Sequence, residues 1–297
     1  MSTLTWDEDP AGSLRLTVDG AEAAVLALGT DIEPLNTPKP HIHPLRTPAG
    51  VTVTGFAPED HPWHHGLQLA MPRVNDHNLW GGGTYLDPQR GYEVIANHGL
   101  IEHVAWTAIH DGATASASES LRWDGLAGEL LLTEERTWRF RVSDSPAAYV
   151  IDLDTRLSNA TEGELLLETP AQNGRSDGGY GGLFLRLQEG FALHGLFGRP
   201  GTDVQTSGAR SDTLVVQGTM AGGSPVTLAL AFVDGPTPGT RTWLHRFDPF
   251  AASCWAVAYD EALRIPAGGH LKLQHRLAVL DGHVDPAAAE AVLTDER

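Results

Sequence analysis

Hydrophobic and polar residues alternate along most of this chain, which is the period of β-strands rather than of helices. Because strand side chains point to opposite faces in turn, this alternation predicts strands with one buried face. Gly, Pro, Asp and Asn residues separate the alternating segments and predict turns between them. The segments that we predict as strands are 13–18, 23–28, 51–56, 66–71, 129–142, 148–159, 164–169, 182–187, 213–218, 226–233, 254–259 and 271–279.

One short helix is predicted at the C-terminal end, over 285–293, with Asp285 as its N-cap and Pro286 in the first turn. No part of the chain alternates strands with long helices, which argues against a doubly wound α/β fold. No repeat of 30–50 residues is present, which argues against a propeller. The pattern predicts an all-β fold: a large antiparallel two-sheet β-sandwich with one short C-terminal helix, forming a single domain over residues 1–297.

Composition narrows the possible partners. The net charge of −18 argues against nucleic acid and anionic membrane surfaces as partners, although 18 of the 20 basic residues are arginines, which bind oxyanions well. The longest apolar run, about 226–233, is too short for a membrane helix, and the first residues lack the pattern of a secretory signal. The single cysteine, Cys254, excludes an intramolecular disulfide and is expected to be buried. We therefore expect a soluble, cytoplasmic protein.

Five histidines within residues 41–65 are the strongest chemical signal: His41, His43, His61, His64 and His65. Histidine is a poor core residue, because each ring nitrogen needs a partner. Three interpretations remain open. The first is a divalent transition metal, because the His41-x-His43 spacing puts both imidazoles on one face of an extended segment. In that case the ligands would be His41, His43, His61 and His64.

The second interpretation is acid–base chemistry without a metal or other cofactor, because histidine titrates closest to neutral pH. The predicted acid–base groups are His43, His64, His65 and His98. Arg46 can clamp an anionic or polyhydroxylated substrate, and Trp63 and Trp80 can provide an apolar face for a sugar ring. The third interpretation is structural: the histidines cap turns, and at most one of the neighbours His64 and His65 faces any one site.

Two further segments add candidate residues. Glu134 and Glu135 lie in the middle of a predicted strand on opposite faces, and we take Glu135 as a candidate general base. The glycine-rich loop that enters the strand at 182–187 carries Asn173, Arg175 and Tyr180, which suit recognition of substrate hydroxyl groups. Three consecutive glycines within 78–87 lack the Gly-Lys-Ser/Thr ending of a phosphate-binding loop and predict a tight bend instead.

These motifs resemble a bacterial family labelled PmoA-like or methane oxygenase PmoA. The matching segments are "HPLRTPAG" (43–50), "PEDHPWHHGL" (58–67), "NLWGGGTY" (78–85), "HGLIEH" (98–103), "LLTEERT" (131–137) and "NGRSDGGYGGLFLR" (173–186). The resemblance implies a galactose-mutarotase-like supersandwich and a role in carbohydrate catabolism. Methane monooxygenase activity itself is not expected, because the chain has no apolar run long enough for the membrane helices of such a subunit.

Together these arguments predict a cytoplasmic carbohydrate-active enzyme that uses histidine acid–base chemistry on a sugar or keto-sugar, of isomerase, lyase or glycoside-cleaving type. The alternatives are a metal-dependent sugar enzyme with histidine ligands and a non-catalytic sugar-binding accessory protein. The expected partner is a small-molecule carbohydrate, and the composition is compatible with a monomer or a homodimer.

Overall fold

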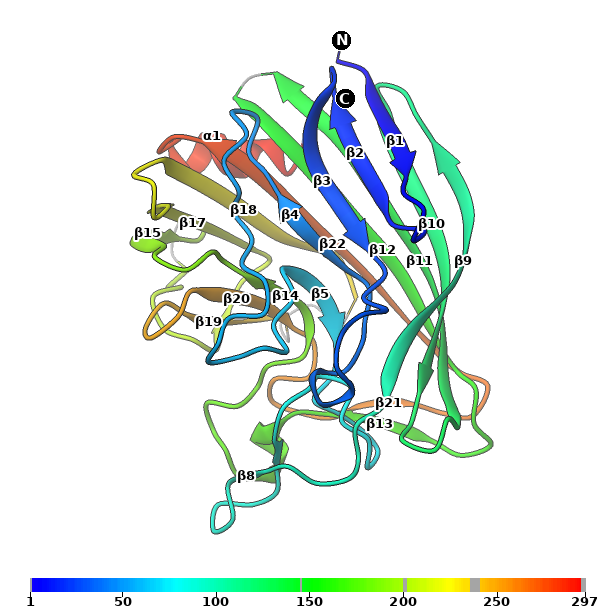
Figure 1. The fold of residues 1–297 in the computed structure, drawn as a ribbon. Coiled ribbons are helices and arrows are strands. Elements are labelled where there is room, and N and C mark those ends of the chain that lie inside the picture. Colours follow the sequence, from blue (N-terminus) through cyan, green and yellow to red (C-terminus); the bar gives the residue numbers. More distant parts are fainter. Residues whose placement is uncertain (1, 145, 200–201, 236–240, 295–297) are drawn as a thin grey trace.

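The computed structural model describes residues 2–144, 146–199, 202–235 and 241–294, in which the alternating segments form two large antiparallel sheets (Figure 1). The first sheet has nine strands. Their spatial order is β1 (Leu4–Glu8), β2 (Leu14–Val18), β3 (Ala21–Ala27), β4 (His41–Leu45), β5 (Leu67–Ala70), β14 (Gly182–Arg186), β20 (Ala252–Ala256), β19 (Thr242–Arg246) and β16 (Ala209–Arg210). Its second half therefore joins strands that lie far apart in the sequence.

The second sheet has eight longer strands and curves around the first (Figure 1). Their spatial order is β15 (Ala192–Phe197), β17 (Thr213–Thr219), β18 (Pro225–Asp234), β22 (His270–Asp281), β12 (Ala147–Asn159), β11 (Leu130–Asp144), β10 (Thr114–Asp124) and β9 (Leu100–His110).

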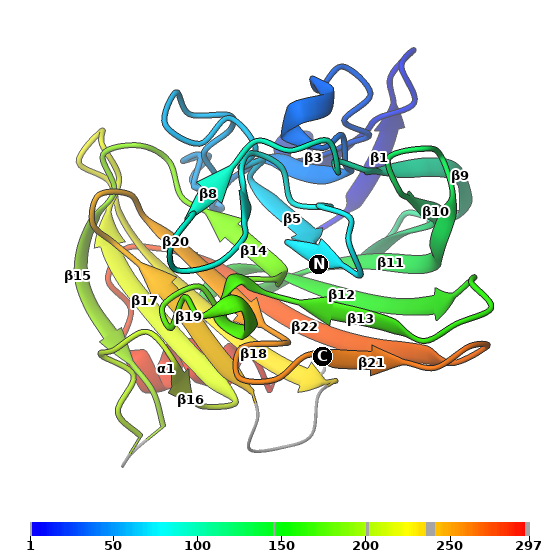
Figure 2. The same cartoon turned by 90° about the horizontal axis from the view of Figure 1, so that it is seen from below.

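Smaller elements surround the two sheets. A three-stranded sheet is formed by β21 (Leu263–Ile265), β13 (Leu165–Glu168) and β6 (Arg73–Val74), and a two-stranded one by β7 (Thr84–Tyr85) and β8 (Tyr92–Glu93). Short 3-10 helices span Pro34–Asn36 and Pro170–Asn173. The segment carrying β8 lies beside β14, β19 and β20 in the view from below (Figure 2), and this arrangement positions the site described below.

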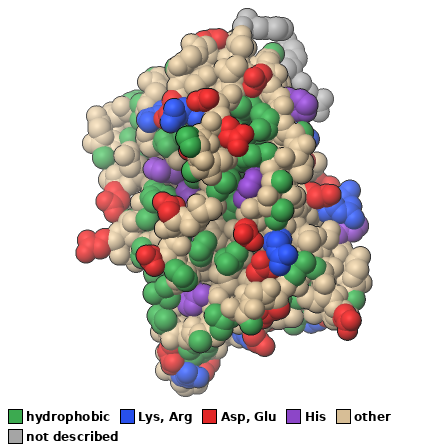
Figure 3. All heavy atoms as spheres, turned by 45° about the vertical axis from the view of Figure 1, so that its right-hand side comes forward, with side chains coloured by type: hydrophobic (Ala, Val, Ile, Leu, Met, Phe, Trp, Pro, Cys, Tyr) green, Lys and Arg blue, Asp and Glu red, His purple; other side chains and the backbone are tan. Residues whose placement is uncertain are grey.

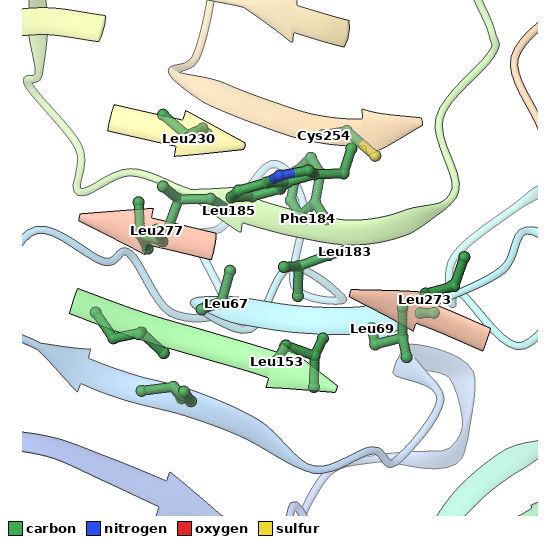
Figure 4. Packing of buried hydrophobic residues seen from close by; sticks show 14 of the residues in the cluster. Leu67, Leu69, Leu153, Leu183, Phe184, Leu185, Leu230, Cys254, Leu273 and Leu277 are labelled. Carbon is green, nitrogen blue, oxygen red and sulfur yellow. The ribbon is translucent and has the colours of Figure 1, made fainter. Parts of the chain in front are cut away.

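The core lies between the two large sheets, where leucines from both pack together (Figure 4), and the same cluster contains buried tryptophans. Leu67 and Leu183 of the first sheet pack in the same cluster as Leu153 and Leu277 of the second. Trp255 is fully buried, and its indole nitrogen donates to the carbonyl of Ala231, which satisfies its one polar group. Each fully buried leucine contributes roughly 1.5–3 kcal/mol, so this cluster supplies much of the driving force for folding.

The predicted fold class is confirmed: two large antiparallel sheets and one short C-terminal α-helix, α1 (Pro286–Val292). The predicted cap is also confirmed, because the Asp285 carboxylate accepts hydrogen bonds from the backbone of Ala287 and Ala288. Cys254 is free and buried, and burial raises the pKa of its thiol to about 12, so it is unreactive.

The strand predictions failed in two ways, because one predicted strand is absent as such and several observed strands were not predicted. The segment 51–56 forms only isolated bridges, through Thr52, Thr54 and Phe56, although its residues alternate. Strands β9 and β10 were missed. In β10 the buried positions include Ala115 and Ala117, which alternate with serines, so the difference in hydrophobicity between its two faces is small.

Among the described residues no helix has both the length and the apolar character needed to cross a membrane. Acidic side chains are spread over the face shown in Figure 3, in keeping with the net charge of −18.

Candidate functional site

A cavity of about 350 Å³ lies on the face of β14, β20 and β19 that points away from the second sheet. Strand register explains which residues form its floor. Phe184 pairs with Cys254 and Arg186 with Ala252 across β14 and β20, while Arg246 pairs with Ala252 from the other side. Since side chains alternate along a strand, these residues share one face, and Trp243 and Trp255 point from the opposite face into the core.

Aromatic rings make up most of the cavity wall. They come from five separate parts of the chain: Trp63, Trp80, Tyr92, Tyr180, Phe184 and Phe250. The Trp80 ring lies 5.0 Å from that of Phe184 and 4.9 Å from that of Tyr180, measured between centroids. Such rings hold one another in place and present flat apolar surfaces to a ligand.

The triple-glycine bend is positioned by close packing against Trp63. Gly81 and Gly82 have φ angles of 108° and 67°, which suit glycine. A Cβ atom at Gly82 would lie 2.7 Å from carbons of the Trp63 ring. The predicted tight bend is therefore present, and it lets the backbone approach an aromatic side chain of the cavity wall.

A fully buried lysine supports the same wall from behind. The Lys39 ammonium donates to the carbonyl oxygens of Asn36, Thr37 and Trp80 at 2.8–2.9 Å. Burial lowers the pKa of Lys39 well below its usual value, because removal from water disfavours the charged form. Lys39 thus fixes the backbone of Trp80 behind the cavity wall.

Two histidines stand side by side in the cavity wall. The rings of His61 and His64 are stacked, with centroids 4.7 Å apart and planes inclined by 15°. Nδ1 of His61 lies 2.7 Å from Oδ2 of Asp60. Nδ1 of His64 lies 3.4 Å from Nη1 of Arg186, whose other nitrogen, Nη2, lies 3.5 Å from Asp60.

These contacts give the two imidazoles opposite tautomers. The Asp60 carboxylate only accepts, so Nδ1 of His61 carries the proton and its Nε2 has a free lone pair. The Arg186 guanidinium only donates, so Nδ1 of His64 accepts and its Nε2 carries the proton. Neither Nε2 atom has a hydrogen-bond partner in the described part of the chain. The pair can thus accept a proton at one ring and donate a hydrogen bond at the other.

The protonation states fit this arrangement. Burial, with a smaller contribution from the charge of Arg186, lowers the pKa of His64 well below its usual value, so His64 is neutral near pH 7. For Asp60, by contrast, burial raises the pKa. The hydrogen bond from His61 and the charge of Arg186 nevertheless lower the pKa of Asp60, which keeps this carboxylate ionised.

Charged groups lie at another side of the cavity. Arg175 donates from Nε to Asp177 at 2.8 Å and from Nη1 to the hydroxyl of Tyr92, which lies 3.0 Å from the hydroxyl of Tyr180. The hydrogen bond from Arg175 lowers the pKa of Asp177. Arg246 of β19 lies 3.4 Å from the same carboxylate.

Of the residues that the sequence identified, five meet at this cavity: Trp63, His64, Trp80, Arg175 and Tyr180. His61 joins them, although we had considered it only as a metal ligand. His65, which follows His64 directly, faces the other way: its Nε2 donates to the carbonyl of Pro62 at 2.9 Å, and burial lowers its pKa to about 2.

The other predicted site residues lie outside the cavity and have structural partners. His43 contacts the Thr54 hydroxyl at 2.9 Å, and Arg46 pairs with Glu22 at 3.0 Å. His98 donates from Nε2 to the carbonyl of Gly82 at 2.6 Å and so supports the glycine bend. Asn173 accepts from Arg73 at 3.3 Å.

The choice of Glu135 as an inward-facing base was wrong. Glu135 is exposed, and its neighbour Glu134 is buried because strand positions alternate. Glu134 is not free for catalysis either: it accepts hydrogen bonds from Trp123, Arg136 and Thr155 inside the sandwich.

The histidines proposed as metal ligands do not converge. His41 and His43 lie against the ring of Phe56, at 5.2 and 5.3 Å, whereas His61 and His64 stack on each other at the cavity. In the described ranges no group of three or more His, Cys, Asp or Glu side chains is arranged to hold a metal ion.

Several cavity residues were not chosen as site residues from the sequence: Tyr92, Asp177, Arg246 and Phe250. Asp177 and Arg246 had a usable signal, since one follows Arg175 in the same loop and the other alternates with Leu244 on a strand. Tyr92 and Phe250 had none, because only the folded chain brings their segments to β14.

The chain belongs to a family of unknown function, DUF6807, whose family model matches residues 13–294. A search of curated proteins gave no match. The resemblance to the PmoA-like family and the galactose-mutarotase-like topology that it implies remain predictions.

Proposed function

We propose that this member of the DUF6807 family is a cytoplasmic carbohydrate-active enzyme that moves a proton on a sugar or keto-sugar with the imidazoles of His61 and His64. The observation that carries the proposal is the pairing of the two rings, each anchored through Nδ1, on a cavity with aromatic walls. A free, buried Cys254 fits a reducing compartment.

The cavity suits a single sugar ring. Its volume of about 350 Å³ lies at the small end of the range of ligand sites, about 300–1,000 Å³. Trp63, Trp80 and Phe184 offer apolar surfaces to the C–H faces of a sugar. Tyr92, Arg175 and Asp177 offer donors and acceptors to its hydroxyl groups.

The opposite tautomers suit proton transfer next to a carbonyl group. Nε2 of His61 takes the proton from the carbon beside the carbonyl, and the electron pair of that C–H bond moves toward the carbonyl oxygen. The Nε2 hydrogen of His64 stabilises the oxyanion that develops there, as a neutral imidazole can. Asp60 stabilises the imidazolium formed at His61.

The proton has two destinations. For an isomerase, the hydroxyl proton on the deprotonated carbon moves to the former carbonyl oxygen, and His61 returns its proton to the former carbonyl carbon, so that the carbonyl group shifts by one carbon. Loss of a hydroxyl from the next carbon, which takes the proton from His61 and leaves as water, gives a lyase. The geometry gives less support to ordinary glycoside cleavage, which uses two carboxylates. Of the described residues that line the cavity, Asp177 is the one carboxylate, and Arg175 holds it.

Exchange of substrate hydrogen with solvent tests the proposal directly. Aldoses, ketoses and 3-keto-sugars are incubated with the protein in D₂O, and NMR follows deuterium entering at carbon. The wild-type protein is expected to catalyse exchange for at least one of them. His61→Gln, whose amide can still reach Asp60, is expected to lower the rate by about 10²–10⁴-fold.

His110→Gln is the matched control, because His110 is exposed on β9, and it should exchange at the wild-type rate. Equal rates for His61→Gln and the wild type would assign His61 a structural role. Saturable sugar binding without any exchange would instead favour the sugar-binding accessory protein.

A further inference from the structure

The charge of the cavity differs in sign from that of the whole protein. Two arginines and one carboxylate line it, Arg175, Arg246 and Asp177, which gives a local charge of about +1 if the histidines are neutral. The chain as a whole carries −18. Outside the lining, Asp60 is balanced by Arg186. A positive cavity in a strongly acidic protein favours an anionic ligand, because it concentrates negative charge locally.

The two arginines are not equivalent. Arg175 donates from Nε and Nη2 to the two oxygens of Asp177 and from Nη1 to Tyr92. All three guanidinium nitrogens of Arg175 therefore already have hydrogen-bond partners. These bonds tie the loop after the 3-10 helix Pro170–Asn173 to β8. Arg175 therefore acts mainly to position Asp177 and Tyr92.

Arg246 is the less committed of the two. Its one hydrogen bond in the described part of the chain is a long contact of 3.4 Å from Nη2 to Asp177, so Nε and Nη1 are free. The guanidinium lies 5.6 Å from the centroid of Phe250, and 34% of the side chain is exposed. Its neighbour across the ladder is Ala252, whose small side chain leaves space above the strand.

Arg246 and the histidine pair lie around the same aromatic ring. The centroid of Phe250 is 4.6 Å from that of His61 and 5.6 Å from that of His64. A ligand group held by Arg246 thus lies in the same cavity as the two imidazoles, beside the ring of Phe250 that all three contact.

We propose that the substrate is a sugar acid, and that Arg246 binds its carboxylate. This inference rests on the proposed function. A free guanidinium edge matches the two oxygens of a carboxylate with two parallel hydrogen bonds. One net positive charge balances a single carboxylate, whereas a phosphate carries about −1.5 to −2 and needs more cationic donors.

Matched ligand pairs test the substrate class. Isothermal titration calorimetry compares glucose with glucuronate and gluconate, galactose with galacturonate, and glucose 6-phosphate with both sets. The wild-type protein is expected to bind at least one acid about 10–100-fold more tightly than its neutral partner, with an affinity that falls as salt is raised. Arg246→Gln should bring the ratio of the two affinities close to one.

Two further variants make the result specific. Arg246→Lys keeps the charge without the fork and should retain part of the preference. Arg264 of β21 is an exposed arginine that pairs with Glu164. The variant Arg264→Gln should therefore bind all ligands as the wild type does.

The remaining outcomes show which of the two proposals fails, the sugar-acid substrate or the enzymatic function. Equal binding of acids and neutral sugars, with exchange in D₂O intact, would overturn the sugar-acid assignment and leave the proposed function standing. Preference for glucose 6-phosphate would replace the carboxylate by a phosphate. Absence of both binding and exchange with every sugar would overturn the two proposals together.

Discussion

At the scale of single residues, the direction of a side chain decides its role. His64 and His65 are neighbours in the chain, yet one lines the cavity and the other packs with His41 and Phe56 behind it. The same holds for Glu134 and Glu135, of which one is buried and the other exposed. Residue type alone therefore identifies candidates, and the backbone selects among them.

A glycine of the cavity wall gives a prediction at this scale. Gly82→Ala places a methyl group 2.7 Å from the Trp63 ring and should displace it. We expect deuterium exchange of the substrate to fall by on the order of 100-fold, because small displacements of positioning groups are costly. Gly128→Ala is the control, since its φ of 81° imposes a similar backbone strain with no atom within 4 Å. The same loss of activity in both variants would refute the role of the Trp63 contact.

At the scale of elements, strand β11 carries charge into the sandwich. Arg136 and Glu134 are both about 1% exposed and pair through Nε and Oε1 at 2.7 Å. Glu119 of β10 lies 3.5 Å from Arg136 and 2.8 Å from Nδ1 of His103 on β9. The network joins β9, β10, β11 and β12 beneath the aromatic core, and its carboxylates depend on Arg136 for compensation.

Removing that arginine should therefore destabilise the fold. Arg136→Met leaves Glu119 and Glu134 buried without their shared cation, and we expect the free energy of unfolding to fall by about 3–5 kcal/mol in urea titrations. Arg139→Met removes an arginine from the exposed face of the same strand, where it pairs with Asp154, and should cost less than about 1 kcal/mol. Similar losses of unfolding free energy in both variants would mean that the buried ion pairs of Arg136 stabilise the fold no more than an exposed pair does.

At the scale of the whole molecule, buried histidines link stability to pH. Burial lowers the pKa of His41 to about 4 and that of His275 to about 3, the latter helped by the charge of Arg241. Their pKa values in the unfolded chain are close to 6.5. Because the unfolded state binds protons that the folded state does not, stability is full above about pH 6.5 and falls as the pH drops toward the folded values.

His275 gives the clearest test, because neither of its ring nitrogens has a hydrogen-bond partner and Phe232 and Trp255 surround it. In His275→Phe the loss of unfolding free energy between pH 7.5 and pH 5 should be smaller by about 2 kcal/mol, measured by urea titration at each pH. His270→Gln alters an exposed position of the same strand and should leave the pH dependence as it is. An unchanged dependence in His275→Phe would show that this residue does not titrate as proposed.

Alternation of hydrophobic and polar residues was enough to predict about half of the strands, the two-sheet class and the C-terminal helix, because the burial of one face is encoded within each segment. The prediction failed where the two faces of a strand differ little in hydrophobicity, as in β10, where alanines alternate with serines. Aromatic and charged residue types also pointed to Trp63, His64, Trp80, Arg175 and Tyr180. Their convergence was not predictable, since β14, β20 and β19 become neighbours through pairing across up to about 70 residues of sequence. The opposite tautomers of His61 and His64 depend on Arg186, which lies more than 100 residues away in the sequence. Long-range contacts of this kind cannot be predicted from the local pattern of residues.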